Sequence, residues 1–377
     1  MKVPFYLHNI GEKEIAQVAE ILKTPLLTTG PVTAEFESLF SKYLGVKHAV
    51  GLTSCTMAMF VTLKALDIGP GDEVITTPMS FISTANVIIH AGAKPVFVDV
   101  EPETGNINVK LIEEAITPAT KAILPVHLYG QMVDMKRIKV IADAYNLYII
   151  EDAAHAIESR RDGIRPGQLG NAACFSFYAT KNITCGEGGA IATGDEALAG
   201  KLKKMRLHGM SKDAVDRYVA KRYQHYDMEF LGYKCNMNNI DAALLINQLN
   251  LIEERWERRQ EICRNYEKAF SKIEGIDYPK VLENSRSGRH LFTVWVEPDS
   301  RDKIMWKLQE KEIGVAVNFR PIHLMKYYRE AFGYQPGMFP EAERIGGSTI
   351  TLPLYPKLSD EEVDYIINTI RDAILRK

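Results

Sequence analysis

Residues 147–156 read LYIIEDAAHA and residues 173–182 read ACFSFYATKN, two apolar runs that each end in polar residues. Both runs are almost continuously apolar, which is the pattern of strands buried on both faces of a sheet. Similar runs alternate with helix-like stretches from about residue 15 to residue 245, and this alternation predicts an α/β domain with a mainly parallel sheet. The predicted strands are HAVGLTS (48–54), DEVITTP (72–78), KPVFVDV (94–100), KAILPVH (121–127), LYIIEDA (147–153) and ACFSFYA (173–179).

The C-terminal third of the chain has a different pattern. Residues 245–272 have the apolar spacing of one long amphipathic helix, which we expect to link two domains. The later segments predict a strand at 290–298 and helices at 301–314 and 360–377. We therefore expect a large domain over residues 13–245 and a smaller α+β domain over residues 246–377, which the N-terminal segment 1–12 joins.

The composition is that of an ordinary globular protein, with 377 residues, 46% hydrophobic residues and a formal net charge of −2. Charges of both signs are interspersed, so nothing in the bulk charge predicts binding to nucleic acid or to a membrane surface. No apolar run approaches the roughly 20 residues that span a bilayer, and the first residues lack the features of a signal peptide, so we expect a cytoplasmic protein. The five cysteines are scattered without a CxxC pair, which predicts neither a disulfide framework nor a metal site.

Three polar clusters follow predicted strands, at the edge of the sheet where α/β proteins bind ligands. The first is Thr53-Ser54-Cys55-Thr56, which ends a strand and opens a helix. Hydroxyls and backbone N–H groups converge at such a point, where the helix dipole favours a phosphate. Taken alone, the cluster is explained better as an ordinary Ser/Thr helix cap.

The second cluster is Glu151-Asp152-Ala153-Ala154-His155, at the end of an apolar strand. A carboxylate there is costly unless it has a cationic partner, and the protonated ring nitrogen of pyridoxal 5'-phosphate (PLP) is such a partner. A buried aspartate beside that nitrogen raises the pKa of the pyridinium and keeps it charged. The alternatives are a helix cap formed by Asp152 and a metal site with His155, for which further ligands are missing from the sequence.

The third cluster is the run from Phe175 to Asn182, where an apolar strand leads directly into Lys181, followed by the glycine-rich turn 185–189. A lysine held near apolar and cationic groups has a lowered pKa and forms an imine with an aldehyde at neutral pH. An isolated lysine after a strand would more often be solvated. A phosphate site, a strand-end aspartate and a strand-end lysine in one chain nevertheless make a complete PLP site, which independent accidents rarely assemble.

These residues resemble the DegT/StrS-type (DegT/DnrJ/EryC/StrS) sugar aminotransferases, which are PLP enzymes of fold type I. The matching segments are LLTTGP (26–31), SCTMAM (54–59), EDAAHA (151–156), FSFYATKNITCGEGG (175–189), RLHGM (206–210), GYKCNMNNIDAALLINQL (232–249) and LPLYP (352–356). The resemblance implies a large domain with a mainly parallel seven-stranded sheet flanked by helices, and a smaller C-terminal α+β domain.

The resemblance also implies a role for each matching residue. Lys181 would be the Schiff-base lysine and the acid/base of proton transfer, and Asp152 would pair with the pyridine nitrogen. Phe81 matches the aromatic position that stacks on the ring, although a buried Phe on a core helix is its simpler explanation. His155 matches the position beside the ring and its 3'-oxygen. The positions that match phosphate contacts are Cys55, Thr56 and Ser176.

The family builds its site across a homodimer, and we expect a dimer here. Many relatives have Asn in the third place of a GYNYR motif, which reaches the neighbouring subunit's phosphate. This chain has Lys234 in that place and Asn236 two residues later, so both are candidates. A branch of the family that replaces the lysine with histidine performs dehydration, and the presence of Lys181 therefore favours transamination.

The forms KNITCGEGG and GYKCN are most similar to enzymes that aminate the 4-keto group of UDP-linked sugars, the 4-amino-4-deoxy-arabinose type. L-glutamate would be the donor, and the product would serve cell-surface polysaccharide, lipopolysaccharide or natural-product biosynthesis. Candidate substrate contacts are Thr29, Arg320 and His323.

Three alternatives stay open. The substrate could be a dTDP-linked 3- or 4-keto-6-deoxysugar, or the protein could be a non-catalytic PLP-binding regulatory protein. An amino-acid aminotransferase is the third, but it would need a C-terminal arginine clamp for the α-carboxylate, and none stands out in the sequence.

Overall fold

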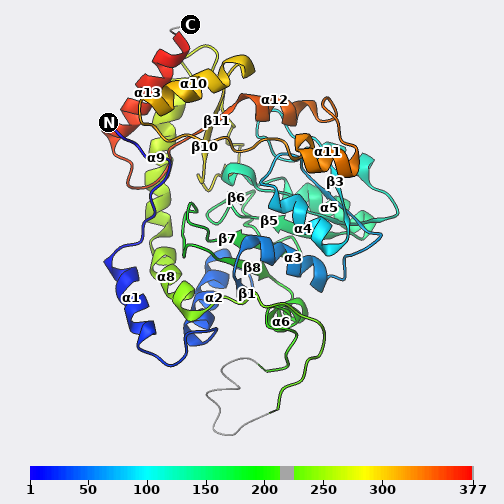
Figure 1. The fold of residues 1–377 in the computed structure, drawn as a ribbon. Helices are drawn as coiled ribbons and strands as arrows, with labels where there is room; N and C mark the ends of the chain where they lie inside the picture. The colour runs from blue at the N-terminus through cyan, green and yellow to red at the C-terminus, as the bar shows by residue number, and fades with distance from the viewer. Residues whose placement is uncertain (213–224, 376–377) are drawn as a thin grey trace.

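The computed structural model describes residues 1–212 and 225–375, and its centre is a seven-stranded sheet in the order β1-β8-β7-β5-β4-β2-β3 (Figure 1). Parallel pairs join β3, β2, β4, β5 and β7, whereas β8 is antiparallel to both of its neighbours. The predicted mainly parallel α/β sheet is therefore confirmed. The strands are β1 (His48–Leu52), β2 (Glu73–Thr76), β3 (Lys94–Phe97), β4 (Thr120–Ile123), β5 (Tyr148–Asp152), β7 (Ala172–Ser176) and β8 (Gly189–Thr193).

Helices cover both faces of this sheet. Alternate residues of β7 show the division, because Cys174 packs with α3 and α6 on one face and Phe175 packs with α2 and α8 on the other. Both faces are thus buried, as the continuous apolar runs predict. The helices are α1 (Glu12–Leu22), α2 (Pro31–Leu44), α3 (Cys55–Ala65), α4 (Ser83–Ala91), α5 (Met135–Tyr145), α6 (Glu196–Met205) and α8 (Asn239–Asn250).

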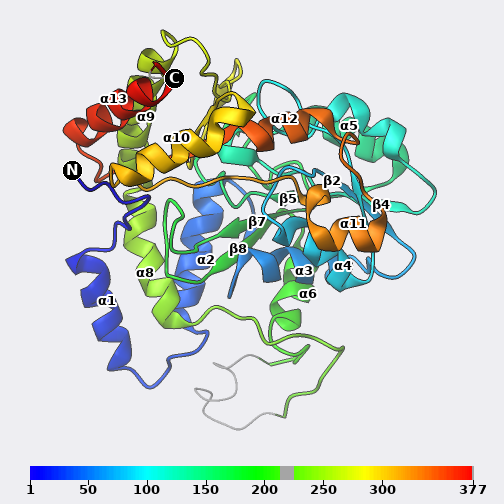
Figure 2. The same cartoon turned by 45° about the horizontal axis from the view of Figure 1, so that its top comes forward.

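The C-terminal part packs around its own apolar core beside the sheet (Figure 2). The antiparallel pair β10–β11 lies in this core with α9, α10 and α13, and Val3 of the N-terminal segment is fully buried in it. Its elements are α9 (Ile252–Phe270), β10 (Phe292–Trp295), α10 (Pro298–Glu310), α11 (Lys326–Phe332), α12 (Pro340–Ser348), β11 (Thr349–Leu352) and α13 (Asp360–Leu375), and a short ribbon pairs β6 (Arg160–Arg161) with β9 (Ser285–Arg286). The last two residues of the predicted C-terminal helix, 376–377, lie outside the described residues.

The expected single helix over residues 245–272 is in fact two helices, α8 and α9, which meet at Leu251. Leu251 has φ −99° and ψ 7°, outside the helical range, although the two helices still run nearly end to end (Figure 1). The reason is that the two helices pack in different apolar cores. Leu249 of α8 packs with α2 and the sheet, whereas Tyr266 of α9 packs with β10. We propose the domain boundary at this junction, a few residues after the expected position.

The parallel strands end at one edge of the sheet and bring distant polar residues together there. Strand β1 leads into the N-terminus of α3, β5 ends at Asp152, and β7 ends at Ser176. The antiparallel strand β8 begins at the same edge, so the loop that carries Lys181 turns back over it. In the part of the chain that the structure describes, no helix is long and apolar enough to cross a membrane.

Gly189, the first residue of β8, allows this strand to approach the first turn of α3. A Cβ atom there would lie 2.3 Å from the carbonyl carbon of Ser54 and 2.5 Å from the amide nitrogen of Cys55.

Both are backbone atoms, so we expect Gly189→Ala to lower the free energy of unfolding by about 2 kcal/mol. The matched control is Gly200→Ala, because a Cβ at Gly200 inside α6 meets no atom of the described residues within 4 Å apart from its own helix backbone and chain neighbours. The control should be neutral or stabilising in urea titrations, and a Gly189 variant as stable as wild type would contradict this account of the contact.

Candidate active site

A cavity of about 530 Å³ lies at the carboxyl edge of the sheet, between the large domain and the C-terminal part. Its lining comes from segments far apart in the sequence, including the start of α3, the ends of β5 and β7, and the loop before β10. Seven of the residues predicted from the sequence line it together: Cys55, Thr56, Phe81, Asp152, His155, Ser176 and Lys181.

The N-terminus of α3 forms one end of the cavity. Ser54 caps the helix, and its hydroxyl accepts a hydrogen bond from the Met57 amide at 3.1 Å. The first N–H groups of a helix have no partner within the helix, so those of Cys55 and Thr56 suit an anion. The Cys55 thiol donates to the carbonyl of Cys174 at 3.3 Å, and burial raises its pKa well above the ordinary value. Cys55 therefore contributes its backbone and a neutral thiol.

Asp152 presents a buried carboxylate at the end of β5. Its side chain is held by the Thr84 hydroxyl, which donates at 2.7 Å, and by the Ala154 amide at 3.2 Å. Burial raises the pKa of Asp152, while these hydrogen bonds and the charge of Lys181 oppose the rise. A cation in the cavity would favour the ionised form further.

Lys181 lies in the loop between β7 and β8, with its amine at the same cavity. Burial lowers the pKa of Lys181 to about 8, although the neighbouring Asp152 and Cys55 act in the opposite direction. Near neutral pH a minor fraction of the amine is therefore neutral, and it is this neutral form that acts as a nucleophile. The Nζ atom lies 3.4 Å from Nε2 of His290.

Aromatic rings border the space between these groups. Phe81 precedes α4 and is 56% exposed, so the simpler explanation of a buried core residue is wrong for it. Phe319 lies 6.2 Å from Phe81 and is stacked with His155 at 5.9 Å, measured between ring centroids. The Tyr129 amide donates to Nδ1 of His155 at 3.3 Å, and burial lowers the pKa of His155 well below its usual value. His155 therefore offers a neutral ring to a flat ligand.

The other predicted residues do not line this cavity. Asn236 donates to the Thr29 hydroxyl at 2.6 Å, and Lys234 donates to the Asn236 side chain at 2.5 Å, so these three form a separate group. Arg320 is exposed. The structure also places His323 elsewhere than expected, because its ring is fully buried and pairs with Glu343 at 2.9 Å.

Several lining residues were missed in the sequence, among them Phe5, His290 and Phe319. They belong to the N-terminal segment and to loops of the C-terminal part, where no strand end marks a ligand-binding position. Only the packing of the two parts against each other brings them to the cavity.

The residues present fit PLP. A helix N-terminus suits the phosphate, a buried carboxylate suits the pyridinium nitrogen, an amine with a lowered pKa suits the aldehyde, and aromatic rings suit the faces of the ring. The fold and the cavity thus define a PLP-dependent aminotransferase of fold type I. The chain belongs to the DegT/DnrJ/EryC1/StrS aminotransferase family, whose model matches residues 8–371.

Individual relatives support this assignment over the full length. The spore coat polysaccharide biosynthesis protein SpsC of Bacillus subtilis (strain 168) is 44% identical in an alignment 377 residues long that covers 99% of this chain and 97% of SpsC. Spr1654 of Streptococcus pneumoniae, named a sugar aminotransferase and solved in its PMP form, is 34% identical, with a TM-score of 0.93 and 100% of both chains covered. PseC of Helicobacter pylori, an aminotransferase involved in the biosynthesis of pseudoaminic acid, is 28% identical, with the same TM-score and coverage. This chain is accordingly a sugar aminotransferase of the family.

The pKa of Lys181 predicts how PLP attaches to the apoprotein. Below a pH of about 8 the amine is mostly protonated and cannot attack the aldehyde. We therefore expect the attachment rate, followed by the visible absorbance of the bound cofactor, to rise with pH and to level off above a midpoint near 8. Lys181→Arg should give no such band at any pH, and a rate that is flat between pH 6 and 9 would contradict the assignment.

Proposed function

We propose that this enzyme transfers the amino group of L-glutamate to a nucleotide-linked 4-keto-sugar, with a UDP-sugar as the preferred substrate. The observation that carries the proposal is the meeting of the Lys181 amine, the Asp152 carboxylate and the N-terminus of α3 at one cavity. The names of SpsC and PseC support a role in making amino sugars for a polysaccharide or related surface glycan.

When bound, PLP supplies an electron sink for the bond changes at the amino carbon. Lys181 holds the cofactor through Nζ and afterwards moves the proton between the cofactor and the substrate carbon. Asp152 would keep the ring nitrogen charged, and Phe81 and His155 would supply aromatic surfaces for the ring. The N-terminus of α3 and the Ser176 hydroxyl would hold the phosphate.

The lining of the cavity favours a sugar over a general amino-acid substrate. No arginine from the described residues lines it, so any clamp for an α-carboxylate must come from outside the lining of this cavity. In the proposal, cations for the glutamate carboxylates and the nucleotide phosphates come from Arg320 and from the second subunit.

We propose a homodimer with shared active sites. Exposed apolar side chains on and near α1 and around residues 226–231 support such an interface, among them Ile15, Leu22, Leu27, Met228 and Leu231. Both side chains are hydrogen-bonded within their own protomer, Asn236 to Thr29 and Lys234 to Asn236, but Asn236 is only 8% exposed whereas Lys234 is exposed. We therefore assign the contact with the neighbouring subunit's phosphate to Lys234.

The amino-group transfer is tested in its two halves. Glutamate should bleach the visible band of the holoenzyme, and a UDP-4-keto-sugar should restore it, with ping-pong kinetics overall. The panel includes UDP- and dTDP-linked 4-keto and 3-keto sugars, together with oxaloacetate and pyruvate. Equal recovery with the two keto acids would favour an amino-acid enzyme, and no bleaching by any amino donor would favour a regulatory PLP protein. Preference for a dTDP-sugar would replace the UDP assignment.

The shared site is tested by complementation between subunits. Lys181→Ala lacks the reacting amine and Lys234→Ala lacks the phosphate contact, so each homodimer should have little activity. After the two variants are unfolded together and refolded at equal amounts, each heterodimer has one intact site, and about a quarter of all sites should be active. The matched control mixes Lys181→Ala with Asn236→Ala. If only this second pair recovers activity through complementation, Asn236 reaches across the interface instead of Lys234.

A further inference from the structure

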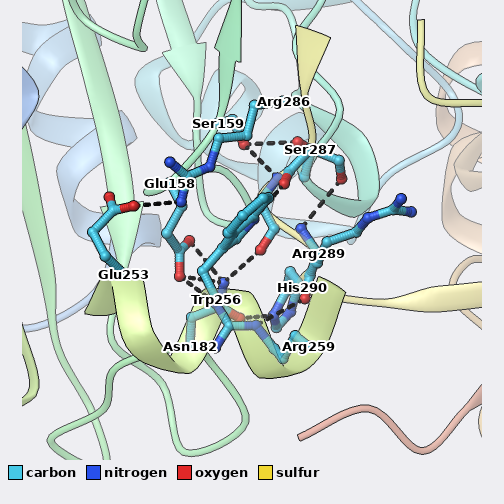
Figure 3. Close-up of polar contacts among 12 residues, drawn as sticks. Glu158, Ser159, Asn182, Glu253, Trp256, Arg259, Arg286, Ser287, Arg289 and His290 are labelled. Carbon is cyan, nitrogen blue, oxygen red and sulfur yellow. Dashed lines mark hydrogen bonds and ion pairs between the residues drawn. The ribbon is translucent and has the colours of Figure 1, made fainter. Parts of the chain in front are cut away.

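A row of polar side chains leads from the reacting amine into the interior of the protein. Nζ of Lys181 lies 3.4 Å from Nε2 of His290, and Nδ1 of His290 lies 3.0 Å from the amide oxygen of Asn182. The row continues from Asn182 to Glu158 and Arg259 (Figure 3). It connects the loop after β7, the segment before β10 and helix α9, so it spans both parts of the molecule.

The surroundings of Asn182 fix the orientation of its amide. The amide nitrogen faces three acceptors, the two carboxylate oxygens of Glu158 at 3.0 and 2.8 Å and the carbonyl of Gly288 at 3.1 Å. An amide oxygen in that place would face only other acceptors, which is unfavourable. The amide oxygen must therefore point to His290.

This orientation fixes the tautomer of His290. The amide oxygen can only accept, so Nδ1 of His290 carries the hydrogen and donates it. The ring is 5% exposed, and burial lowers the pKa of His290 well below its usual value, with the charges of Lys181 and Arg259 acting in the same direction. The neutral ring thus has an unprotonated Nε2 whose lone pair faces the amine of Lys181.

The ion pair at the end of the row is unlike a pair that serves stability alone. Glu158 and Arg259 are 0% and 1% exposed, and each charge has been removed from water. The desolvation of such a pair offsets much of its attraction, so an apolar pair would stabilise the fold about as well. Glu158 instead gives Asn182 two acceptors, and this holds the amide in one orientation.

We propose that His290, set in its Nδ1–H tautomer by Asn182 and the Glu158–Arg259 pair, is a catalytic residue that accepts a hydrogen bond from the Lys181 amine through Nε2. This inference rests on the proposed role of Lys181 in the proposed function. With one N–H of Nζ bound to His290, the lone pair of the amine is directed away from the imidazole and into the cavity. The proton that Lys181 moves is thereby taken up and delivered on the cavity side.

Other groups around Lys181 act on its charge as well. The carboxylate of Asp152 and the thiol of Cys55 favour the protonated amine, and Glu187 and His155 also line the cavity. None of these presents a neutral nitrogen acceptor to Nζ, because Nδ1 of His155 already accepts from the Tyr129 amide. The effect of removing His290 is therefore separable from the effect of removing a charge.

The experiment compares His290→Phe and His290→Gln with wild type. Phenylalanine removes the acceptor and keeps a flat ring, whereas the glutamine amide can present an oxygen near the position of Nε2. A hydrogen bond to an ammonium favours the charged form, so the phenylalanine variant should move the pH midpoint of PLP attachment down by about one unit. The rate of the glutamate half-reaction of the phenylalanine variant should fall about tenfold with its KM unchanged. The glutamine variant should largely restore both the wild-type midpoint and the wild-type rate.

Ser159→Ala is the matched control for disturbance of this region. Its hydroxyl donates to the carbonyl of Gly130 at 2.7 Å and accepts from the amide of Gly288 at 3.1 Å, without contact with Lys181 or His290. We expect this variant to be less stable but to keep the wild-type pH midpoint. If the phenylalanine variant also keeps the wild-type midpoint and rate, the role of His290 is wrong while the role of Lys181 stands. If Lys181→Ala keeps the visible band, the proposed site itself is wrong.

The tautomer of His290 can also be measured directly in the wild-type holoenzyme. In protein labelled with [15N]histidine, the nitrogen shifts should show His290 protonated at Nδ1 and unprotonated at Nε2, and its signals should be absent from the glutamine variant. Protonation at Nε2 would overturn the proposal, because that nitrogen could not accept from Lys181.

Discussion

Two ionisable side chains of opposite charge share one cavity at the edge of a buried sheet, and the chemistry of the enzyme depends on this arrangement. Burial raises the pKa of Asp152 and lowers that of Lys181, so the charged form of each group is less favourable in this cavity than in water. In the proposed function PLP would compensate for this at both groups, because its ring nitrogen would provide a cation for the Asp152 carboxylate and its aldehyde would react with the neutral form of the Lys181 amine. The loss of solvation at Asp152 and Lys181, which is unfavourable for the protein without its cofactor, would therefore favour binding of PLP at this site.

The geometry of the sheet makes this arrangement possible. Parallel strands all end at one edge, and β8, the antiparallel strand, starts there, so the lysine loop is folded over the ends of β1, β5 and β7. Gly189 lets β8 approach the backbone of the first turn of α3 closely. The N-terminus of α3 and the start of β8, which follows the lysine loop, are consequently in close backbone contact.

Around these groups the C-terminal part contributes the second half of the cavity. His290 and Phe319 come from its loops, and the Glu158–Arg259 pair fastens helix α9 to the segment after β5. The site is therefore built between two packed units, a position that α/β enzymes commonly use for ligands. Family membership and the relatives identify a sugar aminotransferase. In the proposed function, the choice among nucleotide sugars would depend on surfaces beyond the residues that hold the cofactor.

The sequence by itself determined the α/β class, the positions of six strands of the large sheet and the meeting of Asp152, Lys181 and the α3 N-terminus. The spacing of apolar residues, the continuously apolar runs and the polar residues at the end of each run can all be read from neighbouring positions in the sequence. Parallel strands end at the same edge of the sheet, so the residues that follow them lie close together. The short strand β8 escaped notice because Gly189–Thr193 consists mostly of small residues, and the single helix expected over 245–272 divides at Leu251 because its two halves pack in different cores. Only the tertiary structure decided that His323 is buried away from the cavity and that His290 faces the amine of Lys181. The reason is physical: a loop residue carries no periodic signal, and its neighbours are set by the packing of segments more than a hundred residues apart.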